Sequence, residues 1–148
     1  MNHYTGTYFI THVPPSILSA NARPNRYAKN KAFQSYKDYV VMDIERQVQD
    51  KSAFPYSRIK LTVLWYLGNG KTNPISHNRY PEEAWGRAFN PRDWDNAVGS
   101  MKAFVDALVA AGVIPDDSFK HLHSIDLKPQ LGKEALGRRC LHVFIEEV

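Results

Sequence analysis

The stretch that decides the fold runs from Asp93 to Ser118 and reads DWDNAVGSMKAFVDALVAAGVIPDDS. Its apolar residues recur every three or four positions, which predicts an amphipathic helix from about Asn96 to Ala111. Gly112 follows the last periodic residue and predicts the end of the helix, because glycine readily adopts the left-handed conformation found at many helix ends. We expect the buried face to carry the following residues, or a set rotated slightly from them: Val98, Met101, Val105, Leu108 and Val109.

Four carboxylates bracket this helix in a chain that is otherwise net positive. Asp93 and Asp95 precede it, and Asp116 and Asp117 follow it. If residues 93–95 are extended, both of the first two carboxylates point to the same side. Because Mg²⁺ prefers oxygen ligands, the four acids are candidates for a site that binds a hard divalent cation.

Each acidic pair also has a purely structural interpretation. Asp95 or Asn96 is a typical N-cap, and residues 115–118, Pro-Asp-Asp-Ser, favour a type I turn. A helix of about 15 residues is roughly 22 Å long, so its two ends cannot share a metal ion unless the chain returns beside the helix. The sequence alone leaves that path open.

Lys102 and Asp106 lie four residues apart on the predicted helix. A surface ion pair worth a few tenths of a kcal/mol is the simplest explanation for this spacing. The order with Lys before Asp is the weaker orientation for such a pair, and it hints that Lys102 has another partner.

Outward from this stretch, the periodicities predict a further helix and four strands. The strands are Tyr4–Val13, Arg58–Leu67, about Phe119–Leu127 and about Arg138–Glu146, and the helix is Ala28 to about Gln49. The order β-α-β-α-β-β predicts one small α/β (α+β) domain over residues 1–148, with a mixed sheet of about four strands packed on two main helices. Residues 68–91 show no period, and so long a connection in a compact domain is usually functional or mobile.

The 148 residues carry 19 Lys and Arg against 15 Asp and Glu, a formal net charge of +4. Much of the excess lies between residues 23 and 37, where five basic residues meet no acid: Arg23, Arg26, Lys29, Lys31 and Lys37. Such a patch either attracts a polyanion or is a solvated surface.

The remaining composition narrows the class of protein. Cys140 is the single cysteine, which excludes an internal disulfide and fits a reducing, cytoplasmic setting. No apolar stretch approaches the roughly 20 residues of a spanning helix, so we expect no membrane partner. No zinc-binding Cys/His pattern, phosphate-binding glycine loop or Ser/His/Asp triad is evident, and we expect no nucleotide cofactor.

Four segments together resemble the RusA family of Holliday junction resolvases, small endonucleases of phage and prophage origin. They are Asp93-Trp94-Asp95-Asn96, the run from Lys102 to Leu108, Ala111-Gly112-Val113, and Asp116-Asp117. The gap from Asn96 to Lys102 is about three residues longer than in the family pattern, which rotates a helix by about 300°. Either the helix starts later, or a loop at Ala97–Ser100 takes up the difference.

The resemblance implies a site and a substrate. Asp93, Asp95 and Asp117 would hold Mg²⁺ (or Mn²⁺) with Asp116 beside them, and Lys102 would stabilise charge on the attacked phosphate. A homodimer would place two such sites on a four-way junction for paired symmetric nicks. Phosphates would bind to Arg87, Arg92 and the residue 23–37 patch. Phe89 or Trp94 could wedge into the opened crossover, with a core position favoured for Trp94 and no preference for Phe89.

Two other functions remain open at this stage. One is a module that binds junctions or single-stranded DNA without cutting, which would have little use for four acids beside a polyanion. The other is a metal-dependent nuclease that acts on flaps or forks, because a carboxylate site determines the chemistry while the surface shape determines the substrate. A metal-free structural domain is the least specific possibility.

Overall fold

The computed structural model describes residues 5–15, 25–48, 50–67, 94–130 and 139–148. The elements in chain order are β1 (Gly6–Ile10), α1 (Arg26–Gln47), a short 3₁₀ helix η2 (Lys51–Ala53), β2 (Ile59–Leu67), α2 (Trp94–Ala110), β3 (Leu122–Gln130) and β4 (Arg139–Glu147). The predicted order β-α-β-α-β-β and the α+β class are confirmed. Residues 68–91, predicted to be irregular, lie outside the described residues.

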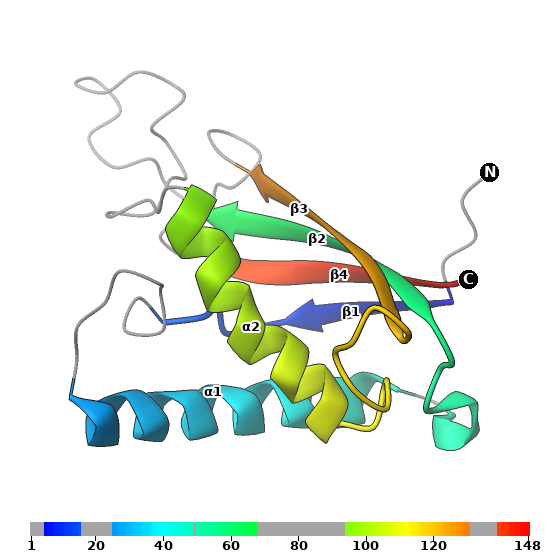
Figure 1. Ribbon diagram of the computed structural model, residues 1–148, viewed down its shortest axis with the longest axis horizontal. Helices are drawn as coiled ribbons and strands as arrows, with labels where there is room; N and C mark the ends of the chain where they lie inside the picture. The colour runs from blue at the N-terminus through cyan, green and yellow to red at the C-terminus, as the bar shows by residue number, and fades with distance from the viewer. Residues whose placement is uncertain (1–4, 16–24, 49, 68–93, 131–138) are drawn as a thin grey trace.

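The four strands form one mixed sheet in the order β1-β4-β2-β3. β4 runs antiparallel to both β1 and β2, whereas β2 and β3 are parallel. A parallel pair needs a crossover connection, and α2 lies in the one between β2 and β3. Figure 1 shows both helices on the same face of the sheet, with α2 crossing it obliquely and α1 running along the β1 side.

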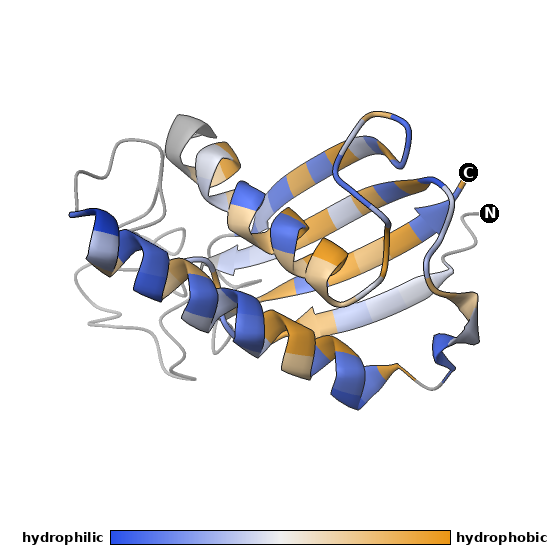
Figure 2. Ribbon diagram, turned by 60° about the horizontal axis from the view of Figure 1, so that its bottom comes forward, coloured by the Kyte–Doolittle hydropathy of each residue, from blue (hydrophilic) through white to orange (hydrophobic). Residues whose placement is uncertain are grey.

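The core lies between that face of the sheet and the two helices (Figure 2). Alternate residues of β2 are buried, as the period of a strand requires: Ile59, Leu61, Val63 and Trp65. On α2 the predicted face is partly wrong, because Val98 is 58% exposed and Phe104, which was not predicted, is fully buried. Since α2 packs against α1 as well as covering the sheet, its buried face is wider than one stripe and includes Phe104.

Hydrogen bonds from polar side chains of α1 link this helix to the edge strand β1 and to Thr11 just after it. The Phe9 N–H donates to Gln47 Oε1 at 2.7 Å, and Gln47 Nε2 donates back to the Phe9 carbonyl at 2.6 Å. The buried Asp43 carboxylate accepts from the Thr11 N–H at 2.8 Å and the Thr11 hydroxyl at 2.9 Å, and it pairs with Arg46. Gln47 therefore satisfies backbone groups that an edge strand otherwise leaves open to another chain.

The end of α2 at Gly112 is confirmed, with a φ of 81°. The Gly112 N–H donates to the Val109 carbonyl and the Val113 N–H to the Leu108 carbonyl, both at 3.0 Å. These two bonds make a Schellman motif, which satisfies carbonyls at the helix end and turns the chain away from the helix axis. Val113 and the following Ile114 are buried, which anchors the segment that leads to the acidic turn.

Replacing Gly112 by alanine should destabilise the protein by about 1–2 kcal/mol, because a left-handed backbone strains any residue with a Cβ. A Cβ here would meet no atom within 4 Å, so the cost is conformational and not steric crowding. Urea denaturation measures the change in the free energy of unfolding. Gly112→Asn is the matched control and should lose less free energy of unfolding than Gly112→Ala, since asparagine tolerates this conformation. Equal stability of the alanine and asparagine variants would contradict this explanation.

Candidate active site

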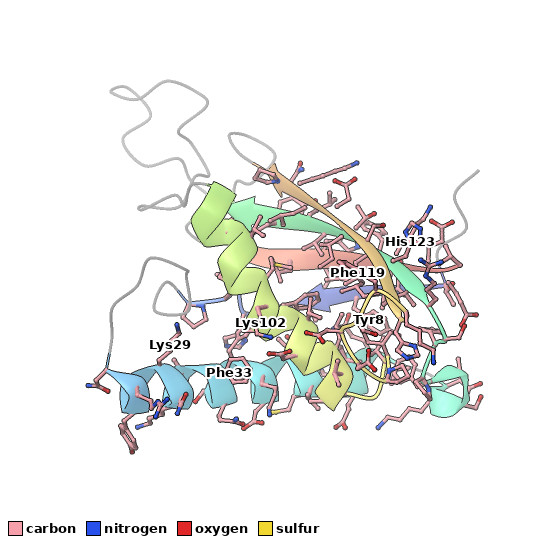
Figure 3. All side chains as sticks on the ribbon, viewed as in Figure 1. Tyr8, Lys29, Phe33, Lys102, Phe119 and His123 are labelled. Atoms are coloured by element: carbon pink, nitrogen blue, oxygen red, sulfur yellow. The ribbon has the colours of Figure 1, made fainter. Side chains whose placement is uncertain are left out.

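A three-residue charge cluster joins the middle of α2 to the turn that follows it. The ammonium Nζ of Lys102 lies 3.5 Å from Asp106 Oδ2 and 3.8 Å from Asp117 Oδ2. Lys102 projects from α2 (Figure 3), whereas Asp117 lies five residues beyond Gly112. The chain therefore does return beside the helix, and Asp117 is the second partner that the weak Lys102–Asp106 spacing hinted at.

The three side chains differ in their contact with solvent. Lys102 is 71% exposed and Asp117 51%, whereas Asp106 is 28% exposed. Ion pairs this open to water contribute little to stability and exchange partners easily. Asp117 is thus accessible to an incoming cation, and Lys102 to an incoming anion.

A groove of about 300 Å³ opens between α2 and the edge strand β3 beside this cluster. Lys102 and Asp117 are its charged lining residues, and the others are apolar: Val98, Met101, Val105, Leu122, Ile125 and Leu127. The exposed Val98 is therefore part of a groove wall. The charge cluster thus stands at a hollow in the surface and not on a flat face.

Asp116 and Asp117 are neighbours in sequence but contact different groups. Asp116 Oδ1 accepts the Ser118 N–H at 2.9 Å, and the Ser118 hydroxyl and N–H together hold the pKa of Asp116 below its usual value. Asp116 Oδ2 lies 3.7 Å from His121 Nε2. The Ser118 N–H thus bonds to the Asp116 side chain, as in an Asx turn, and no backbone bond of the predicted type I turn is seen in the described chain. Asp117, in contrast, lies beside Lys102 of α2.

His121 supports this turn and was not predicted to do so. Its Nδ1 lies 2.7 Å from the Ser57 carbonyl, which only accepts hydrogen bonds, so Nδ1 carries the proton. The ring thereby links the start of β3 to the segment before β2 while its other nitrogen faces Asp116. The period-two spacing of His121 and His123 gave no sign of this contact, because it depends on a residue 64 positions away.

The backbone corrects the prediction for the residues before Lys102. Trp94 and Asp95 are helical and not extended, and α2 is continuous through residues 97–100. Both sequence-based explanations of the longer gap are therefore wrong: the helix starts earlier than expected, and it contains no loop. Lys102 lies seven residues, close to two full turns, after Asp95, so the two Cα atoms are on the same side of the helix.

The predicted metal ligands are only partly within the described chain. Asp93 and the side chains of Trp94 and Asp95 lie outside it, as do Arg23, Arg87, Phe89 and Arg92. Within the residues that the structure describes, no three His, Cys, Asp or Glu side chains gather closely enough to hold a metal ion. The ligand set that combines Asp117 with the first acidic pair stays a prediction.

The described basic residues of the 23–37 patch lie in the N-terminal half of α1 and at its midpoint, and this half extends past the end of the sheet (Figures 1 and 2). Arg26, Lys29 and Lys31 are exposed and Lys37 is half-buried, with its Nζ 5.8 Å from the centre of the Phe33 ring. No ion pair neutralises any of these four residues within the described chain. Their charge is therefore available to an anionic partner.

Neither helix of the described chain is both long enough and apolar enough to cross a membrane. A search of curated proteins finds no match to this chain. The family model described as "Endodeoxyribonuclease RusA" matches residues 14–131, which include Lys102, Asp106, both residues of the acidic turn and the basic half of α1. On this match over most of its length, the chain belongs to the RusA family of endodeoxyribonucleases, the Holliday junction resolvases.

Proposed function

We propose that this protein is a metal-dependent endonuclease that resolves four-way DNA junctions by paired symmetric nicks, acting as a homodimer. The observation that carries the proposal is the approach of Asp117 to Lys102, 3.8 Å apart. That approach brings the second acidic segment to the helix that begins at the first one. It thereby supports one site built from two segments that are more than twenty residues apart.

We propose Asp93, Asp95 and Asp117 as the ligands of Mg²⁺, for which Mn²⁺ can substitute. The chemistry of Asp117 fits a hard cation, since it is a half-exposed carboxylate at the edge of the groove. When bound, a divalent cation lowers the pKa of a water molecule and stabilises negative charge on the phosphate. Asp116 is better suited to holding the turn, because its Oδ1 accepts the Ser118 N–H and its Oδ2 lies 3.7 Å from His121 Nε2.

Lys102 has the exposure and the position to contact the attacked phosphate. Its ammonium offers three donors and is 71% exposed at the edge of the groove. Placed beside the phosphate, it would stabilise the charge that develops as the bond to the leaving oxygen breaks. In-line attack by water would leave 5′-phosphate and 3′-hydroxyl ends.

The shape of the substrate explains the dimer and the basic residues. A four-way junction has near two-fold symmetry, and a C₂ dimer supplies two sites related by the same operation. We propose that the unneutralised basic half of α1 binds backbone phosphates together with Arg23, Arg87 and Arg92, and that Phe89 wedges into the crossover.

The proposal predicts that Asp117→Asn lowers Mg²⁺-dependent cleavage of a labelled four-way junction by on the order of 100-fold or more, while junction binding persists. Asp116→Asn is the matched control and should retain much more activity, because its contacts stabilise the turn. Flap, fork and linear duplex substrates run in parallel identify the preferred substrate. Tight junction binding by wild-type protein with no cutting under Mg²⁺ or Mn²⁺ would favour a binding module and reject the nuclease.

Junction affinity should fall steeply as the salt concentration rises. In a plot of the logarithm of the binding constant against the logarithm of the salt concentration, each phosphate neutralised by the protein contributes about −0.9 to the slope. The double variant Lys29→Ala/Lys31→Ala should therefore reduce that slope by up to about two if both residues bind phosphates. Lys51→Ala/Lys60→Ala removes the same charge from exposed positions outside the basic half of α1 and should leave the slope unchanged. Equal slopes for the two double variants would place the DNA elsewhere.

A further inference from the structure

Asp106 has no part in the chemistry proposed above, yet it is the closer of the two carboxylates to Lys102. The distances from Lys102 Nζ are 3.5 Å to Asp106 and 3.8 Å to Asp117. One positive charge is thus shared between two negative ones that lie on different elements. Asp106 is fixed one turn along the same helix, whereas Asp117 belongs to the turn beyond Gly112.

The Lys102 ammonium loses its contact with Asp117 when a divalent cation binds there, but it can keep its contact with Asp106. Like charges repel, so a cation there pushes the Lys102 ammonium away. Asp106 gives the ammonium a carboxylate to remain beside, and this carboxylate is the more shielded of the two at 28% exposed. With Asp106 neutralised, Asp117 would be the one described carboxylate still paired with Lys102, and the ammonium and the metal would compete for it.

We infer that Asp106 is a positioning residue that holds the Lys102 ammonium beside Asp117 without letting it block metal binding there. The inference rests on the proposed function, since it takes Asp117 as a metal ligand. It assigns Asp106 no contact with metal or DNA. Its effect passes through Lys102 alone.

The direct test is the Mn²⁺ dissociation constant of the protein without DNA, measured from the free Mn²⁺ signal in electron paramagnetic resonance. Asp106→Asn keeps the shape of the side chain and removes its charge, and it should raise this constant about two- to fivefold, the size expected from one exposed ion pair. Asp106→Glu retains the charge and should bind Mn²⁺ nearly as the wild type does. An unchanged constant in Asp106→Asn would overturn the inference.

Measuring the effect of Asp106→Asn in a Lys102→Met protein shows whether Asp106 acts through Lys102 or only through its own negative charge. In Lys102→Met the competing ammonium is gone, so adding Asp106→Asn should change the Mn²⁺ dissociation constant much less than it does in the wild type. The same increase in both backgrounds would show that Asp106 acts by its own field, and that result would also overturn the inference. Asp126→Asn is the control for a lost surface acid, because Asp126 pairs with Lys128 at 3.5 Å on β3.

Cleavage supplies an independent check. Single-turnover junction cleavage by Asp106→Asn should be slow at limiting Mg²⁺ and return to the wild-type rate at saturating Mg²⁺, because excess metal outcompetes the ammonium. A deficit that persists at saturating Mg²⁺ would contradict the mechanism. Asp117→Asn separates a failure of the proposed metal site from a failure of the inference about Asp106. If Asp117→Asn leaves Mn²⁺ binding intact, Asp117 is not a metal ligand and the proposed metal site is wrong, whatever the Asp106 variants show.

Discussion

The structure depends on the packing of α2 against both the sheet and α1. Phe104 and Leu108 are buried there, and this packing fixes the rotation of the helix about its axis. Once that rotation is set, Lys102 must face the β3 side, where the groove opens. The Schellman motif at Gly112 and the buried Val113 and Ile114 then return the chain so that Asp117 reaches the same side. The position of the charge cluster is thus a consequence of apolar packing more than of the charges themselves.

The electrostatics of the cluster suit a protein that binds a polyanion. Carboxylates beside a DNA backbone weaken binding unless something neutralises them, and here an ammonium lies between two of them. The three groups are exposed enough for water to screen them, so the arrangement can rearrange at little energetic cost. The described basic residues of the 23–37 patch lie elsewhere, on α1, and we propose that DNA binding there is separate from the cleavage chemistry.

The fold was largely predictable because it follows from periodicity. The apolar periodicity located β2 and α1 in the chain, and Gly112 marked the end of α2. Polar contacts between distant elements were not predictable in this way. Asp43 and Gln47 appear polar in the sequence of α1, and only the tertiary structure shows that they bond to Thr11 and to the backbone of Phe9.

The candidate site was predictable in its residue types but not in its geometry. Sequence reasoning placed Asp116 and Asp117 together, whereas the fold divides them between His121 and Lys102. It also expected an extended segment where α2 already begins, since the motif does not show how far the helix reaches toward its N-terminus. The spacing between Lys102 and Asp106 did indicate a second partner, but which one depended on the path of the chain after Gly112.

The central claim is that the turn after α2 and the N-terminal part of α2 form one metal site. NMR spectra of the protein titrated with Mn²⁺ test it most directly, because the paramagnetic ion broadens the signals of nearby amides. The account predicts early, joint broadening at Asp117 and at Asp95 in the first turn of α2, with the amides near the C-terminal end of α1 unaffected. Broadening confined to only one of the two segments, or centred elsewhere, would contradict it.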